Sequence, residues 1–290
     1  MVPKEYYGRL FTKEQLPVDY HSEAFTLESM IKVDKQLRCK RCYSQIEEDW
    51  QLPEGQYYCR ACIVFGRNQE GKELYYFPSK TSEIEFPVLK WLGELTPYQA
   101  EVSEKLLETY QKQKDSLVHA VTGAGKTEMI YKIVAYVLGN KGRVAIASPR
   151  VDVCRELFLR MQRDFTCSIS LLHAESEPYD GSPLVIATTH QLLKFYQNFD
   201  LVIVDEVDAF PFVGNVMLNH AVEQAKKETG RYIYLTATST ISLEEQVRLG
   251  AIEKHHLARR FHGNPLVLPK FCWQGRLQKF LMRGKLPRPL

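Results

Sequence analysis

The chain has 290 residues, of which 44% are hydrophobic and 25% charged, a composition that excludes a wholly disordered, collagen-like or coiled-coil protein. No apolar run approaches the roughly 20 residues needed to cross a bilayer, and the first residues do not resemble a signal peptide. We therefore expect a cytoplasmic protein, or one peripheral on the inner face of the cell membrane, with room for two modules.

The net charge of +3 is distributed unevenly along the chain. Residues 1–94 carry a net charge of −2, residues 95–250 carry −3, and residues 251–290 carry +8. A basic end on an acidic body favours contact with a polyanion, or packing of that end against an acidic surface of the same protein. Its prolines predict irregular structure, so we interpret residues 251–290 as a basic linker.

Two cysteine pairs mark a small β-rich module over residues 36–80. The pair Cys39 and Cys42 is followed, after 16 intervening residues, by the pair Cys59 and Cys62. This spacing is typical of zinc ribbons, in which four thiolates surround a structural Zn²⁺. A redox-active Cys-x-x-Cys motif is the alternative, but it does not explain two matched pairs. The other cysteines are expected to be core or free thiols: Cys154, Cys167 and Cys272.

Basic and aromatic residues are interleaved around these cysteines. Such a surface binds single-stranded nucleic acid by charge and stacking. Equally, aromatic residues pack the small core of any ribbon, and basic residues solvate its surface. The sequence leaves both interpretations open for Arg38, Lys40, Arg41, Arg60, Arg67, Tyr43, Trp50, Tyr57 and Tyr58. It assigns no role to residues 1–35.

Over residues 95–250, strands alternate with helices, which predicts an α/β fold with a doubly wound parallel sheet. Thr96 and Pro97 suit the first two positions of a helix, and Ser242 to Glu245 resemble a capping box that starts the last one. The other expected helices cover residues 126–138, 152–164 and 191–196, and the expected strands cover residues 116–121, 143–148, 168–172, 184–187, 201–204 and 232–236.

A loop of small residues ending in lysine and threonine lies between an expected strand and an expected helix. At a helix N-terminus, such a loop lets backbone N–H groups surround phosphate oxygens. We expect Lys126 to neutralise the β and γ phosphates of ATP and the Thr127 hydroxyl to ligate Mg²⁺. The predicted ATP-binding loop comprises Thr122, Gly123, Ala124, Gly125, Lys126 and Thr127.

Two acids, Asp205 and Glu206, follow a buried apolar strand. Carboxylates after such a strand lie at the edge of the sheet where ligands bind in open α/β folds. We expect Asp205 to hold Mg²⁺, and Glu206 to orient and deprotonate the water that attacks the γ phosphate. Together with Lys126, they are the predicted catalytic residues.

Gln99 precedes the phosphate loop and has two interpretations. Its amide offers both a donor and an acceptor, so it can recognise adenine. Alternatively, Thr96 and Gln99 form a capping box at the start of their helix. We favour adenine recognition.

These motifs resemble those of a superfamily-2 helicase. Residues 120–127, 205–208 and 236–238 resemble its motifs I, II and III, residues 95–99 its Q motif, and residues 148–150 and 187–191 motif Ia and the segment after it. The resemblance implies a RecA-like first lobe over residues 95–250. It also implies that Thr236 and Thr238 couple the γ phosphate to the nucleic-acid face, and that the nucleic-acid backbone contacts Pro149, Arg150, Thr188 and Thr189. Simple strand-end and helix-cap turns are the structural alternative.

A four-cysteine ribbon ahead of such a lobe resembles the ComFA family, the late-competence helicases of Gram-positive bacteria. The resemblance implies an ATPase that drives single-stranded DNA uptake in natural transformation, with ATP, Mg²⁺ and Zn²⁺ as cofactors. The implied partners are single-stranded DNA, ComFC-like and DprA-like competence proteins, and the uptake channel at the membrane. A homo-oligomer is a further expectation.

Two alternative functions stay open at this point. One is a DNA-repair, replication-restart or RNA helicase with an accessory ribbon, and the other is a zinc-dependent nucleic-acid-binding scaffold with an ATP-controlled lobe. The residues after Thr238 are too few for a second RecA-like lobe with its arginine finger, and we interpret Gln274 to Arg276 as a chance match to that motif. We therefore expect residues 1–290 alone to bind ATP weakly and hydrolyse it poorly.

Overall fold

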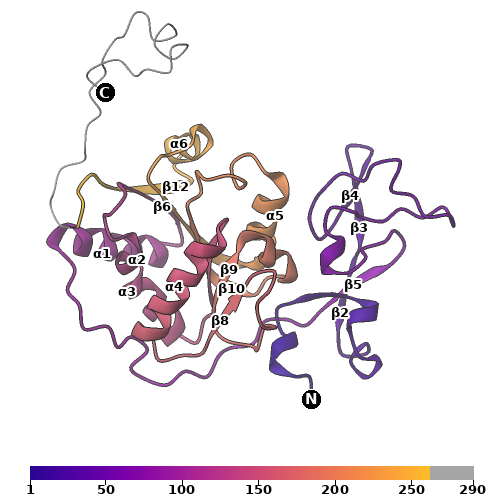
Figure 1. Cartoon of the computed structure of the whole chain (residues 1–290), viewed down its shortest axis with the longest axis horizontal. Helices are drawn as coiled ribbons and strands as arrows, with labels where there is room; N and C mark the ends of the chain where they lie inside the picture. Colours follow the sequence, from indigo (N-terminus) through magenta and orange to yellow (C-terminus); the bar gives the residue numbers. More distant parts are fainter. Residues whose placement is uncertain (262–290) are drawn as a thin grey trace, which may run out of the picture.

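A seven-stranded sheet forms the centre of the computed structural model, which describes residues 1–261 (Figure 1). The strand order is β12-β6-β11-β10-β7-β9-β8, and every neighbouring pair is parallel. This confirms the predicted doubly wound sheet. The strands are β6 (Asp115–Ala120), β7 (Val144–Ser148), β8 (Ile169–Leu172), β9 (Leu184–Thr188), β10 (Phe199–Asp205), β11 (Lys226–Thr236) and β12 (Ile252–Leu257).

Helices cover both faces of this sheet. Because successive side chains of a strand point to opposite faces, Ile146 and Ile203 pack in one apolar core while Ala147 and Val204 pack in the other. The first core contains residues of α1 (Pro97–Gln111), α2 (Lys126–Met129), α3 (Tyr131–Gly139) and α4 (Val151–Asp164). The second contains residues of the 3-10 helix η5 (Thr189–Lys194), of α5 (Val216–Ala225) and of α6 (Ile241–Arg248).

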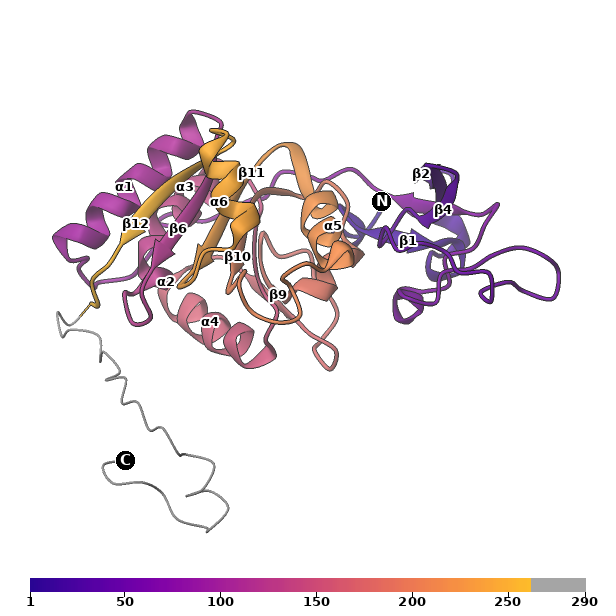
Figure 2. The ribbon, with the colours of Figure 1, turned by 90° about the horizontal axis from the view of Figure 1, so that it is seen from above.

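The amino-terminal residues form a separate β-rich module beside α5 (Figures 1 and 2). Residues 1–35 and 36–80 contribute to it together, because β5 pairs in antiparallel fashion with β1 on one side and β2 on the other. Its strands are β1 (Leu10–Thr12), β2 (Phe25–Glu28), β3 (Met30–Val33), β4 (Gln36–Cys39) and β5 (Glu73–Tyr76). Its 3-10 helices are η1 (Lys4–Tyr6), η2 (Lys13–Gln15), η3 (Val18–Tyr20) and η4 (Ile63–Phe65).

The module contacts the lobe at α5 and just after η5, where the N–H of Tyr196 donates to the carbonyl of Gly8 at 2.9 Å. The His220 ring of α5 stacks on Tyr43 with 5.1 Å between centroids, and its Nε2 lies 3.1 Å from the carbonyl oxygen of Lys40. The four buried cysteines belong to the same apolar cluster as α5 residues such as Leu218. The contact is therefore a continuous core and not a flexible tether.

The observed helix ends agree with the predicted ends at some termini and differ from them at others. Thr96 and Gln99 form the capping box of α1. The capping box predicted at Ser242 is wrong, because Thr240 is the N-cap of α6 and accepts a hydrogen bond from the N–H of Leu243. The helix predicted over residues 126–138 is divided at Ile130 into α2 and α3.

The carboxyl-terminal part of the described chain differs more strongly from the structure predicted from the sequence. The sequence predicts irregular structure over residues 251–290, whereas residues 252–257 form β12, which pairs with β6 at the edge of the sheet. The strand is hard to recognise because one of its buried residues is His255, a polar residue that lies 3.3 Å from the Thr109 hydroxyl. Residues 262–290, including Cys272 and Gln274 to Arg276, lie outside the described residues.

Within residues 1–261, none of the helices is both long and apolar enough to cross a lipid bilayer.

Because β12 belongs to the sheet, its apolar contacts contribute to stability. Leu257 is 6% exposed and packs in the core that contains α1. We predict that Leu257→Ala lowers the free energy of unfolding by about 2–5 kcal/mol in urea titrations, as buried leucines do. His256→Ala, an exposed neighbour on the same strand, should cost less than about 1 kcal/mol. Equal, small effects of both changes would indicate that the segment is a linker.

Candidate functional site

The phosphate loop connects the end of β6 to the start of α2. Gly123 and Gly125 have φ values of 78° and 75°, the left-handed region that favours glycine. A Cβ atom at Gly125 would lie 2.3 Å from the Gln99 side chain, so no larger residue fits there. The Lys126 amine donates to the carbonyl of Ala120 across the loop at 3.4 Å. The loop is thus closed around its backbone N–H groups at a helix N-terminus, as phosphate binding requires.

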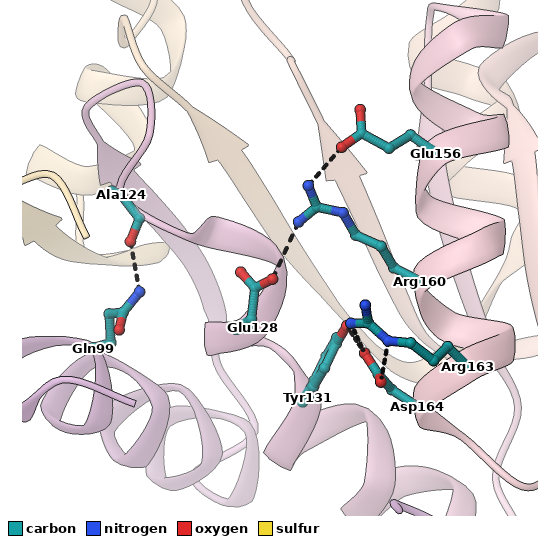
Figure 3. A network of polar contacts seen from close by, with 8 residues as sticks. All are labelled: Gln99, Ala124, Glu128, Tyr131, Glu156, Arg160, Arg163 and Asp164. Carbon is teal, nitrogen blue, oxygen red and sulfur yellow. Dashed lines mark hydrogen bonds and ion pairs between the residues drawn. The ribbon is translucent and has the colours of Figure 1, made fainter. Parts of the chain in front are cut away.

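Gln99 is buried beside this loop, with 2% of its surface exposed. Its Oε1 accepts from the N–H of Thr96 at 2.9 Å, and its Nε2 donates to the carbonyl of Ala124 at 2.8 Å (Figure 3). The capping box is therefore present, and the same side chain also fixes the phosphate loop. Adenine recognition by Gln99 stays a prediction.

Asp205 and Glu206 lie at the end of β10, facing the loop. Burial raises the pKa of Asp205 to about 6, although the nearby Lys126 ammonium opposes this shift. The Asp205 carboxylate accepts from the N–H of Glu206 at 2.9 Å, and Glu206 has a φ of 55°, an uncommon value outside glycine. Such local strain is characteristic of functional sites. A partly buried carboxylate near a lysine is suited to holding a divalent cation with its bound phosphates.

Motif III lies against Asp208, which follows those two acids in the chain. The Thr236 hydroxyl donates to the carbonyl of Thr238 at 2.6 Å and accepts from the N–H of Thr238 at 3.0 Å. The Thr238 hydroxyl in turn donates to the carboxylate of Asp208. These contacts link the end of β11 to the segment after β10, and the coupling role of the two threonines stays a prediction.

The four residues predicted to contact nucleic acid lie at the same edge. Pro149 and Arg150 follow β7, and Thr188 pairs in register with Ser148 at the end of β9. The Arg150 side chain is about half exposed, whereas Thr188 and Thr189 are buried, with 8% and 0% of their surfaces exposed. Of the four, Arg150 thus presents a charged group to solvent, and a nucleic-acid role for the threonines stays a prediction.

Sequence reasoning missed an ion-pair network on the other side of the loop. Arg160 of α4 pairs with Glu128 of α2 at 3.1 Å and with Glu156 at 2.6 Å (Figure 3). Nearby, Tyr131 donates to Asp164, which also pairs with Arg163. Only the i,i+4 spacing of Glu156 and Arg160 is visible in the sequence.

The segment after β12 was missed as well. The N–H of Phe261 donates to the carbonyl of Gly123 at 2.9 Å, and the Arg259 guanidinium lies over the Tyr98 ring and donates to its hydroxyl at 3.0 Å. Phe261 also lines a cavity of about 460 Å³ next to the loop, together with Trp91, Leu95, Gln99, Gly125, Glu128 and Arg160. No local sequence signal links these distant segments.

The four cysteines of the amino-terminal module converge as predicted. All are fully buried, and their sulfur atoms lie within 4.8 Å of one another. Hydrogen bonds from the other three thiols lower the pKa of Cys39. The amide of buried Asn68 donates to Cys39 Sγ at 3.1 Å, an outer contact of the kind that orients metal ligands.

The distances suit a tetrahedral metal site. Zn–S bonds of about 2.3 Å place the sulfur atoms of a tetrahedron about 3.8 Å apart. Here Cys39 and Cys62 are separated by 3.6 Å and Cys42 and Cys59 by 3.5 Å, without any disulfide among the described cysteines. The set of ligands therefore fits Zn²⁺ and leaves no position open for substrate.

Burial of Asp205 has a measurable consequence for stability. Its folded pKa of about 6 exceeds the ordinary value of 3.8, so its contribution to stability is present at low pH and is lost as the pH rises through about 6. Without nucleotide or Mg²⁺, we predict that Asp205→Asn raises the melting temperature at pH 7.5 and that this gain shrinks between pH 6 and 4. Exposed Asp19→Asn is the control. A gain that is independent of pH would contradict this prediction.

Comparison with known proteins agrees with this geometry. The DEAD/DEAH box helicase family model matches residues 96–246, more than half of the chain. Competence protein ComFA of Streptococcus pneumoniae is 55% identical over 97% of this chain, and ComFA of Bacillus subtilis is 34% identical over 96%. The replication restart protein PriA of Bacillus subtilis is 23% identical over 61% of the chain and 24% of its own length.

The chain spans 65% and 62% of the lengths of the two ComFA relatives. The family model covers the phosphate loop, both acids and motif III, the elements that the structure brings to one sheet edge. The chain belongs to the DEAD/DEAH box helicase family, and its resemblance to the ComFA family is confirmed by these two relatives.

Proposed function

We propose that this chain is the ATP-binding part of a motor that moves single-stranded DNA during natural transformation. The observation that carries the proposal is the convergence of the phosphate loop and of Asp205 and Glu206 at one edge of the sheet. The similarity to competence protein ComFA supports the biological setting. A motor of this kind works at the cytoplasmic face of the membrane, where imported DNA emerges.

In the proposed reaction, backbone N–H groups of the loop and the Lys126 ammonium hold the phosphates of ATP. Thr127 and Asp205 would hold Mg²⁺, which neutralises charge on those phosphates when it is bound. Glu206 orients the attacking water and accepts its proton. Thr236 and Thr238 connect this centre to the strand ends that face the nucleic acid.

For the amino-terminal module, we propose a structural Zn²⁺ bound by Cys39, Cys42, Cys59 and Cys62. Their burial and sulfur separations of 3.5–3.6 Å support this assignment. The module also contains a buried arginine, Arg41, whose guanidinium donates to the carbonyl of Gly66 at 2.8 Å and so connects the two cysteine loops. A metal-stabilised module fixed to α5 suits a part that keeps its shape while the lobe works.

The catalytic assignment is tested on the full-length protein. We predict that Glu206→Gln lowers the ATP hydrolysis rate by about 10²–10⁴-fold while an ATP analogue still binds, because only the proton acceptor is lost. Lys126→Ala should abolish binding and hydrolysis together. The rates are measured with single-stranded DNA, duplex DNA and RNA, and the largest stimulation is expected with single-stranded DNA.

The matched control is Glu175→Gln, an exposed acid away from the described site. It should keep the wild-type rate. Unchanged hydrolysis after Glu206→Gln would contradict the role of Glu206, and equal stimulation by RNA or duplex would contradict the proposed substrate.

The zinc assignment is tested by metal content and protease resistance. We expect the wild-type protein to contain about one Zn²⁺ per chain. We predict that Cys59→Ser loses this metal and makes the cysteine module sensitive to protease, because metal binding is a large part of the folding free energy of such modules. Cys167→Ser, a half-buried cysteine outside the cluster, should retain the metal. Full zinc content in the Cys59→Ser protein would contradict the site.

A further inference from the structure

Arg150 lies between the candidate nucleotide site and the edge of the sheet where nucleic acid is proposed to bind. It follows β7 as the N-cap residue of α4, at the edge where nucleic acid is proposed to bind. One guanidinium nitrogen, Nη2, lies 2.5 Å from a carboxylate oxygen of Asp152, and the other, Nη1, lies 3.7 Å from Oε1 of Glu206. The proposed nucleic-acid ligand and the proposed catalytic base are therefore direct neighbours.

The Glu206 side chain is held from one side only. Its Oε1 faces Arg150, while its Oε2 is buried and has no hydrogen-bond partner among residues 1–261. A buried carboxylate oxygen without a partner is costly, so Oε2 is available to a water molecule or a ligand. The backbone of Glu206 lies in the left-handed region, with a φ of 55°. The direction of the carboxylate therefore depends on the side-chain rotamer.

The role inferred here for Arg150, on arrival of a nucleic-acid strand, rests on the proposed function. We propose that Arg150 is a positioning residue that senses nucleic acid: without a strand it holds the Glu206 carboxylate away from catalysis, and a phosphate of the strand displaces Glu206 from it. The freed carboxylate then orients the attacking water. ATP hydrolysis is thereby linked to occupation of the nucleic-acid edge.

The strengths of the contacts favour this exchange. The Arg150–Glu206 pair is long, and the two side chains are 52% and 33% exposed, so it is a weak ion pair. A phosphate accepts two parallel N–H donors of a guanidinium and binds it more strongly. Asp152 can keep its contacts with Nε and Nη2 during the exchange, because Nη1 and the second N–H of Nη2 are the paired donors left for a phosphate. Arg150 can therefore exchange Glu206 for a phosphate while it stays bound to Asp152.

The experiment measures ATP hydrolysis by the full-length protein with and without single-stranded DNA. We expect Arg150→Ala to raise the DNA-free kcat roughly 2- to 5-fold, the range of a weak ion pair, with little change in KM for ATP. The further stimulation by saturating DNA should fall by the same factor, because the ion pair that DNA would break is already absent. Arg150→Lys keeps the charge but not the paired donors, so it should restore part of the coupling. Arg155→Ala, an exposed arginine on the same helix with no ion pair among the described residues, is the matched control and should behave as wild type.

Other roles of Arg150 give different results. If Arg150 only binds DNA, Arg150→Ala leaves the DNA-free kcat unchanged, raises the DNA concentration for half-maximal stimulation, and reaches full stimulation at saturation. If it only supports the fold, both rates fall. Either result overturns the proposal. Failure of the proposed function would give a different result from failure of the role of Arg150. In that case the wild-type protein would show no DNA-stimulated ATP hydrolysis for Lys126→Ala to abolish.

Discussion

The parallel arrangement of the central sheet is the constraint on which the candidate site depends. Since neighbouring strands run in the same direction, the residues that follow them meet at one edge. The register places Asp205 beside Leu235, Thr236 beside His119, and Ser148 beside Thr188. Five segments that are distant in the sequence thus form one surface, on which the phosphate loop, the acids and the proposed strand-binding residues are adjacent. An antiparallel sheet would divide them between two edges.

Much of this site can be predicted from the sequence because its chemistry is encoded locally. A phosphate loop needs glycines with positive φ just before a helix, and residues 120–127 contain that whole requirement. The same holds for the four cysteines, whose spacing alone predicts a cluster, and for the capping box of Thr96 and Gln99. In each case the residues that interact are neighbours in the chain or belong to matched pairs.

The contacts that could not be predicted connect segments far apart in the sequence. Arg259 reaches Tyr98, and His220 reaches Lys40, and neither pair has a local signature. The burial of His255 could not be predicted either, because a histidine in a strand does not indicate burial. At α6, Thr240 and Ser242 are both good N-cap residues, and tertiary packing rather than preference decides between them.

The attachment of the amino-terminal module to α5 has a mechanical consequence. The helix begins at Val216, ten residues after Glu206, and four residues later His220 contacts the first cysteine loop. The residues between Glu206 and α5 form turns, whereas α5 itself shares one apolar core with the cysteine cluster. Because that core is continuous, the module keeps its place on the lobe, and any partner bound to the module is held beside α5.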